Sequence, residues 1–134
     1  MGRNFIDTVT ESRVGIPLLT PGAAKAALDG DPRTLVLDVR DSGDLNITGI
    51  IPGSAHVSLG TLFYSADHDM PEQYRAPCLA DKSRPIIATC TLGMVASIAA
   101  RTLRDYGFTD VAILEGGNKA WGEAGLPLER APVP

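Results

Sequence analysis

Residues 86–114 read IIATCTLGMVASIAARTLRDYGFTDVAIL and carry the clearest structural pattern of the chain. It begins and ends with short apolar runs, Ile86 to Thr89 and Val111 to Leu114, which do not alternate with polar residues. Continuous apolar runs are typical of strands buried on both faces of a parallel sheet. Between them, Met94 to Tyr106 carries apolar residues at four-residue spacing and is followed by Gly107, which predicts a helix. Strand, crossover helix and parallel strand together indicate an α/β sheet with helices on both faces.

Two further elements are predicted upstream of this unit. Residues 34–39 form a third apolar run, which we expect to be another buried strand of the same sheet. Residues 21–29 are predicted to be a helix, because Thr20 can cap its start and Gly30 can end it. Residues 61–84 contain two prolines and several charges, and they predict a long, partly helical connection over the surface.

Length and composition limit the possible functions. The chain has 134 residues, the size of one domain, with 44% hydrophobic residues and a net charge of -4. It has no run of basic residues, so we do not expect nucleic acid as a partner. Its apolar stretches are too short to cross a bilayer, and no apolar signal sequence is evident. We therefore expect a cytoplasmic protein without a membrane partner.

The chain is expected to contain one folded domain with two short ends. Residues 1–19 form an N-terminal extension in which Phe5, Val9 and Val14 can line one side of a short helix. Residues 20–130 form the domain, and residues 131–134 form a C-terminal tail. The role of the extension stays open between packing on the domain, dimerisation and disorder. The oligomeric state also stays open.

Cys90 is the candidate reactive residue, because it lies between a predicted strand and a predicted helix. Backbone N–H groups at a helix start lack intrahelical partners and carry the positive end of the helix dipole. A curled loop over residues 91–96 can therefore direct several donors at an anionic sulfur, and Gly93 lets the backbone turn. The alternative is an unreactive, buried cysteine that only fills space in the core. The spacing alone does not decide between the two.

Three separated signatures resemble the rhodanese-like sulfurtransferase domain over residues 18–130. They are Leu37-Asp38-Val39-Arg40, then Gly49-Ile50-Ile51-Pro52-Gly53-Ser54, then Cys90 with Gly93, followed by Gly107-Phe108, Leu114-Glu115-Gly116-Gly117, Ala120-Trp121 and Gly125-Leu126-Pro127. The resemblance implies an α/β domain with a central, mainly parallel, five-stranded sheet. It also implies that Cys90 is the catalytic cysteine and holds sulfane sulfur as a persulfide.

The sequence also departs from the family pattern within the loop. Family members that use thiosulfate well often carry a basic residue there, whereas Thr91, Leu92, Met94 and Val95 offer none. A neutral to apolar pocket does not favour thiosulfate as the preferred donor. Ala96 stands where a hydroxyl often adds a donor, so the backbone is expected to do most of the stabilising. The related phosphatases have a longer loop that ends in an arginine clamp, and the absence of such a clamp argues against phosphatase and arsenate reductase activities.

Two residues outside the loop have open roles. Arg40, at the end of the strand over residues 34–39, can attract an anionic donor or form a structural ion pair, and we include it among the candidate binding residues. Cys78 can resolve an oxidised Cys90, although its position gives no sign of proximity. The full set of candidate site residues is Cys90 as the catalytic residue and Thr91, Leu92, Gly93, Met94, Val95, Ala96 and Arg40 as binding residues.

The sequence thus predicts a sulfurtransferase that acts by double displacement through a Cys90 persulfide. The donor is thiosulfate, a polysulfide or a persulfide, and the acceptor is a small thiol or a protein cysteine. No cofactor and no metal site are expected. The alternatives are a rhodanese-fold module that binds a protein partner without catalysis and a redox sensor that pairs Cys90 with Cys78. A reactive Cys90 is expected to react with iodoacetamide at lower pH than an ordinary thiol does.

Overall fold

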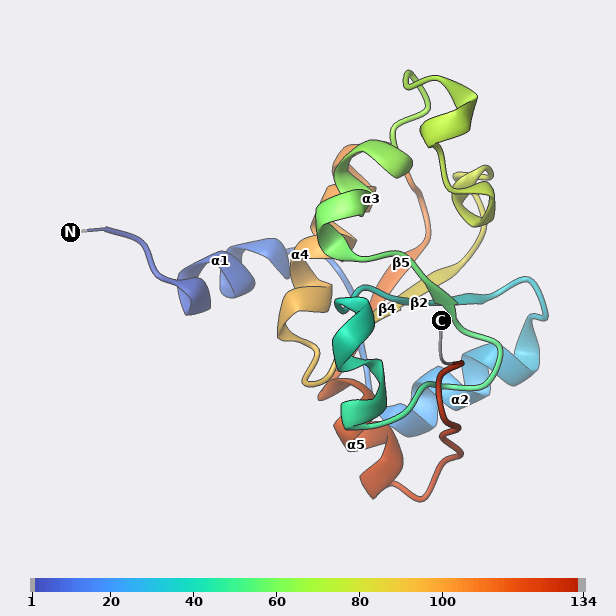
Figure 1. Ribbon diagram of the computed structural model, residues 1–134. Helices are drawn as coiled ribbons and strands as arrows, with labels where there is room; N and C mark the ends of the chain where they lie inside the picture. Colours follow the sequence, from blue (N-terminus) through green and yellow to red (C-terminus); the bar gives the residue numbers. More distant parts are fainter. Residues whose placement is uncertain (1, 133–134) are drawn as a thin grey trace.

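Five parallel strands form the centre of the computed structural model, which describes residues 2–132 (Figure 1). The strands are short and their order across the sheet is β1-β5-β4-β2-β3, with bounds β1 Leu18–Leu19, β2 Leu35–Asp38, β3 Ala55–His56, β4 Ile86–Thr89 and β5 Val111–Leu114. Every pair of neighbouring strands is parallel. The predicted α/β fold with a central five-stranded parallel sheet is therefore confirmed.

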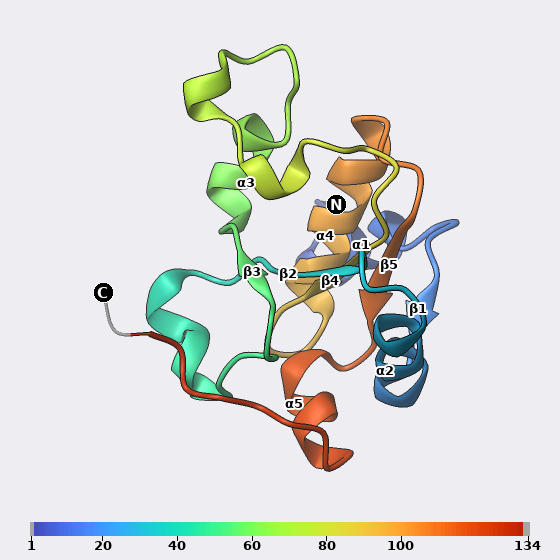
Figure 2. The same cartoon turned by 90° about the vertical axis from the view of Figure 1, so that its right-hand side faces the viewer.

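Helices cover both faces of this sheet (Figure 2). The α-helices are α1 Phe5–Ser12, α2 Pro21–Gly30, α3 Leu59–Ser65, α4 Met94–Asp105 and α5 Gly117–Glu123. Three 3-10 helices lie in the connections, namely η1 Ser42–Ile47, η2 Glu72–Tyr74 and η3 Pro77–Leu79. The last two, with α3, make up the long surface connection that the prolines between residues 61 and 84 predict.

The core consists of two apolar clusters, one on each face of the sheet. Strand β2 shows the division, because successive side chains of a strand point to opposite faces. Leu35 and Leu37 join the larger cluster with α3 and α4, whereas Val36 joins the smaller cluster with Ala24 of α2 and Trp121 of α5. All four residues of β2 are buried. Burial on both faces explains why this strand reads as a continuous apolar run.

The N-terminal segment packs on the domain as a helix. Asn4 caps α1 through a capping box, in which its side chain accepts from the Asp7 N–H and Asp7 accepts from the Asn4 N–H. Helix α1 lies against α4 (Figure 1), and Val9 is buried there. Arg101 of α4 donates to the carbonyl oxygens of Ser12 and Val14. The segment is thus fastened to α4 at both its apolar face and its C-terminal end.

The C-terminal end of the described chain crosses the side of the domain that carries η1. The Ala131 N–H donates to the Asn46 side chain at 2.8 Å, and Ala131 is buried. Of the predicted tail over residues 131–134, Val133 and Pro134 lie outside the described residues. No helix within residues 2–132 is both long enough and apolar enough to cross a lipid bilayer.

Candidate active site

Cys90 lies at the carboxyl end of the central strand β4, directly before the loop that leads into α4. Its side chain is almost fully buried, at 4% relative exposure. The Gly93 N–H donates to Sγ at 3.1 Å and the Ala96 N–H donates to it at 3.3 Å. Helix α4 has no other side-chain cap at its N-terminus. The sulfur thus takes the place of a capping oxygen at the positive end of a twelve-residue helix.

Gly93 gives the loop its shape. Its φ is 82°, in the left-handed region that L side chains rarely adopt, and a Cβ there would lie 2.7 Å from the Leu114 carbonyl oxygen. This conformation turns the Gly93 N–H back toward Sγ while its carbonyl starts the helix. Among the candidate loop residues 91–96, Gly93 and Ala96 donate directly to the sulfur. Met94 and Val95 occupy the first turn of α4, where N–H groups have no intrahelical partner.

The start of α5 supports the outer side of the same loop. The Asn118 N–H donates to the Cys90 carbonyl at 2.8 Å, and the Lys119 N–H donates to the Thr91 carbonyl at 3.1 Å. The buried Asn118 side chain also accepts from the Thr89 hydroxyl and donates to the Gly49 carbonyl. These bonds tie the Cys90 loop to the end of β4 and to the turn at Gly49. No local sequence pattern marks Asn118 as a site residue.

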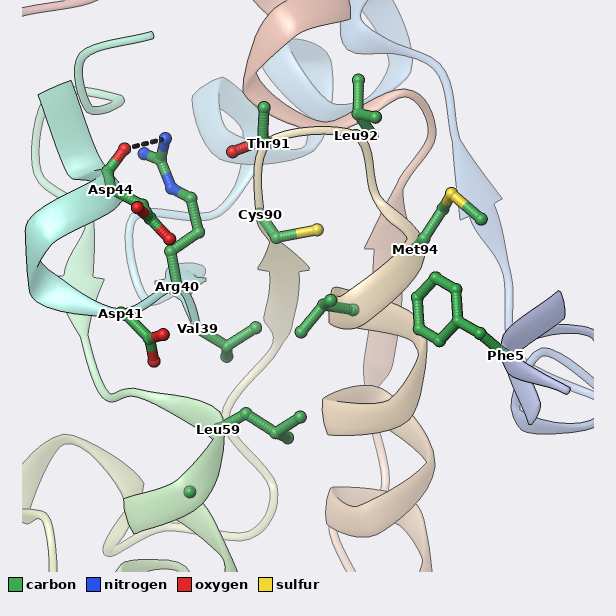
Figure 3. Close-up of a pocket in the computed structure, with 12 residues that line it drawn as sticks. Phe5, Val39, Arg40, Asp41, Asp44, Leu59, Cys90, Thr91, Leu92 and Met94 are labelled. Carbon is green, nitrogen blue, oxygen red and sulfur yellow. Dashed lines mark hydrogen bonds between the residues drawn. The ribbon is translucent and has the colours of Figure 1, made fainter. Parts of the chain in front are cut away.

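A pocket of about 490 Å³ opens in front of Cys90 (Figure 3). It is lined mainly by apolar side chains, and the full lining is Phe5, Val39, Arg40, Asp41, Asp44, Leu59, Gly60, Cys90, Thr91, Leu92, Met94 and Val95. Four of the predicted binding residues, Thr91, Leu92, Met94 and Val95, line it together with Arg40. The remaining two, Gly93 and Ala96, lie behind them and donate to the sulfur. The structure therefore brings all of the candidate site residues together.

Arg40 lines the pocket but directs its guanidinium into the protein. Nε and Nη2 donate to the two carboxylate oxygens of Asp38, at 3.0 and 2.7 Å. The other donors go to the Asp44 and Gly49 carbonyls and the Thr48 hydroxyl. Because a guanidinium has five N–H donors, these bonds engage all of them. Binding of a sulfur donor by Arg40 would require one of these bonds to open.

Residues from the N-terminal segment also reach the site, although no sequence pattern places them there. Phe5 of α1 forms one wall of the pocket, beside Met94 (Figure 3). Arg13 donates through Nε to the Ser97 hydroxyl at 2.8 Å and through Nη2 to the Gly93 carbonyl at 3.3 Å. The Ser97 hydroxyl in turn donates to the same carbonyl at 2.8 Å. Arg13 and Gly93 are 80 residues apart in sequence, so no local pattern links them.

Cys78 and the two histidines lie apart from the pocket. Cys78 is half-buried in η3, before β4, whereas Cys90 follows β4, and both cysteines are free. Burial raises the pKa of the Cys78 thiol above its usual value. His56 contacts the Arg40 carbonyl and His68 contacts the Leu79 carbonyl. None of the three lines the pocket within the described part of the chain.

The comparisons with known proteins agree with this geometry. The model of the rhodanese-like domain family matches residues 20–124. Thiosulfate sulfurtransferase GlpE of Shewanella oneidensis is 32% identical over 89 residues, which cover 66% of this chain and 76% of the relative. A solved structure from Rhodopseudomonas palustris, of unknown function and described as a possible tyrosine phosphatase, is 31% identical, covers 96% of both chains and has a TM-score of 0.87. The polysulfide-sulfur transferase homodimer of Wolinella succinogenes is 28% identical over 95% of this chain and 88% of its own, with a TM-score of 0.71.

Proposed function

This chain belongs to the rhodanese-like domain family, and we propose that it carries sulfane sulfur on Cys90 from a donor to a thiophilic acceptor. The observation that carries the proposal is the pair of backbone N–H groups, from Gly93 and Ala96, that donate to Sγ at the floor of an open pocket. Such donors stabilise an anionic sulfur, and a thiolate is the form that attacks. Sulfurtransferases among the relatives of the chain support the same chemistry.

The reaction consists of two displacements at sulfur. In the first, the Cys90 thiolate attacks the outer sulfur of a polysulfide or persulfide, an Sγ–S bond forms, and the donor S–S bond breaks. The shortened donor leaves as a thiolate or shorter polysulfide anion, so charge is conserved and no oxidant is needed. In the second, an acceptor thiolate attacks the outer sulfur, and Cys90 leaves as the thiolate. The N–H groups at the start of α4 stabilise the anionic sulfur in both states.

The pocket lining favours a polysulfide or an organic persulfide over thiosulfate as the donor. Phe5, Val39 and Leu59 provide apolar contacts, whereas the exposed Asp41 and Asp44 carboxylates carry negative charge at the same pocket. Arg40 is the sole cation of the lining, and Asp38 pairs with it. The sulfonate end of thiosulfate therefore lacks a free cation to bind. A linear or organic sulfur chain does not need one.

Phosphoryl transfer fits the loop less well. A phosphate dianion needs donors for three equatorial oxygens, which an arginine clamp commonly supplies. Residues 91–96 contain no basic side chain. The possible phosphatase activity attached to the R. palustris relative therefore does not extend to this loop. We place the sulfur transfer in a reducing, cytoplasmic setting, because Cys90 must stay unbridged to act.

The test is the intact mass of the reduced protein after incubation with polysulfide and, separately, with thiosulfate. We expect the protein to gain one sulfur with polysulfide and little with thiosulfate. Cyanide is expected to remove the added sulfur and release thiocyanate. The Cys90→Ser variant is expected to gain no cyanide-labile sulfur, and Cys78→Ser is expected to behave as the wild type. An unmodified Cys90 with both donors would contradict the proposal and favour a partner-binding module.

A further inference from the structure

We infer that Arg13 is the positioning residue of the Cys90 loop and supplies, from the N-terminal segment, the positive charge that the loop sequence lacks. Arg13 follows α1 and lies outside the matched region of residues 20–124. It is half-buried, and its guanidinium bonds reach the Gly93 carbonyl and the Ser97 hydroxyl. Gly93 is the residue whose own N–H donates to the Cys90 sulfur. Arg13 thus acts on the sulfur through Gly93.

The guanidinium of Arg13 differs from the other cations near the loop because no carboxylate neutralises it. Within residues 2–132 it forms no ion pair, whereas Arg40 pairs with Asp38, Arg101 of α4 with Asp105, and Lys119 of α5 with Glu123. Its two acceptors are a neutral carbonyl and a neutral hydroxyl. The full charge therefore remains at the N-terminal end of α4, on the same side as the positive end of the helix dipole.

Apart from Arg40, which pairs with Asp38, the charged side chains that line the pocket oppose an anionic sulfur. Asp41 and Asp44, from the segment after β2, are the carboxylates that line the pocket, and α3 contributes only Leu59 and Gly60 to the lining. Glu115, exposed between β5 and α5, adds another negative charge at the carboxyl end of the sheet. A positive charge in addition to the backbone dipoles would therefore favour a thiolate or persulfide at Cys90. Arg13 is placed to provide it, and a partly buried charge is weakly screened by salt.

The geometry of the three-residue network also fixes the loop. The Gly93 carbonyl accepts from both Arg13 and Ser97, so the peptide that begins α4 is held from two directions. This peptide joins Gly93, whose N–H donates to Sγ, to the first turn of α4, from which the Ala96 N–H also donates to Sγ. An N-terminal helix that only covered the surface would not need this contact. The segment therefore contributes to the site as well as to packing.

The test is the rate of Cys90 alkylation by iodoacetamide as a function of pH, in a Cys78→Ala background. We expect Arg13→Gln to lower the rate at pH 7 by about three- to tenfold and to move the profile to higher pH, with the limiting rate at high pH unchanged. Arg13→Lys is expected to recover part of the loss, because it restores the charge without the two-pronged bond. An unchanged profile in Arg13→Gln would overturn the inference.

Arg101→Gln provides the matched control. Arg101 also ties the N-terminal segment to α4, through Ser12 and Val14, yet it does not contact the loop and already pairs with Asp105. We expect its profile to equal that of the background protein. If Arg101→Gln shifts the profile as much as Arg13→Gln does, docking of the segment and not the Arg13 charge would be responsible. Circular dichroism and thermal unfolding of each variant establish that the fold is intact.

The inference rests on the proposed function only in requiring an ionisable Cys90, and the two can fail separately. Alkylation reports the thiolate without any sulfur donor. A protein that takes up no sulfur but shows the Arg13-dependent profile would refute the sulfurtransferase proposal and leave the role of Arg13 standing. A protein that takes up sulfur but whose alkylation profile does not depend on Arg13 would support the sulfurtransferase proposal and refute the role of Arg13.

Discussion

The Arg40 guanidinium and the Asp38 carboxylate form a fully buried, two-pronged ion pair at the end of β2. Their side chains are 4% and 1% exposed, and the shorter of the two contacts is 2.7 Å. The pair links the strand to the turn at Gly49 and to Thr48, because Arg40 also donates to both. A buried pair of this kind holds the backbone beside the pocket in one arrangement. Removal of one partner would leave an uncompensated charge inside the protein.

We therefore predict that Arg40→Met lowers the free energy of unfolding by about 3–5 kcal/mol, the usual cost of leaving a buried charge unpaired. Urea denaturation measures this. Arg33→Met is the control. Arg33 Nε lies 3.8 Å from Asp31 Oδ1, and the two side chains are 59% and 41% exposed, so this pair contributes only about 0–1 kcal/mol. Equal losses in the two variants would show that the Asp38 pair has no structural role.

Phe5→Ala is predicted to weaken donor binding without changing the chemistry at Cys90. Phe5 is 48% exposed and supplies part of the apolar wall, so its removal is expected to raise KM for polysulfide by about two- to fivefold. Steady-state thiocyanate formation separates KM from kcat, and kcat is expected to stay constant. Ile6→Ala is the control, since Ile6 is 56% exposed on the same helix but does not line the pocket. A matching rise in the Ile6 variant would point to loosening of α1.

Gly117→Ala is predicted to disrupt the site because the added methyl group would clash with the backbone of the Cys90 loop. A Cβ at Gly117 would lie 2.5 Å from the Cys90 carbonyl oxygen and 2.6 Å from that of Thr91, and the φ of 61° already disfavours alanine. We expect sulfur loading to fall by about tenfold or more, because small displacements of reacting groups have large effects on rate. Loading kinetics by intact mass provide the measurement.

Gly125→Ala separates the steric effect of Gly117→Ala from the effect of backbone conformation. Gly125 has a φ of 80° but nothing within 4 Å of the added Cβ. We expect Gly125→Ala to lower the free energy of unfolding by only about 1–2 kcal/mol, the cost of an L residue in the left-handed conformation. Sulfur loading is expected to stay unchanged. A Gly117 variant that loads sulfur as fast as the Gly125 variant would contradict the steric argument.

The buried Cys78 thiol is predicted to make stability fall at alkaline pH. Burial raises its pKa in the folded state above the unfolded value. Its contribution is therefore complete below the unfolded pKa and is lost as the pH rises toward the folded pKa, because the unfolded chain releases the proton first. Urea denaturation at pH 7.5 and pH 9.5 is expected to show a smaller drop in Cys78→Ala than in the wild type. An equal drop in both would contradict the prediction.

The strongly patterned elements were predictable from the sequence. The predicted strands at 86–89 and 111–114 match β4 and β5, and the helix predicted from Met94 begins at that residue. Each of these segments is buried on one or both sides, so its apolar pattern reflects its final position. The predicted strand over 34–39 is longer than β2 by one residue at each end. Boundaries of this kind depend on individual hydrogen bonds and vary by a residue or two.

The elements and contacts that sequence reasoning missed depend on tertiary structure. Strands β1 and β3 have two residues each, too few to show a period, and they exist because β5 and β2 offer partners. The loop around Cys90 was predictable because strand, cysteine, glycine and helix are adjacent in sequence. Arg13, Phe5 and Asn118 were not, since each reaches the site from a separate element. Because these residues are distant from Cys90 along the sequence, no local pattern predicts their contacts.

The short edge strands also affect how molecules meet one another. A sheet edge exposes unpaired N–H and C=O groups, to which the strand of a second molecule can add. Here each edge, β1 or β3, presents only a two-residue strand. Of the longer, four-residue strands, β4 lies between β2 and β5, whereas β1 and β3 pair with only two residues on the outer sides of β5 and β2. The short edge strands therefore limit edge-to-edge strand pairing between molecules at high protein concentration. Cys90 follows β4, which no neighbouring molecule can pair with because β2 and β5 occupy its two sides.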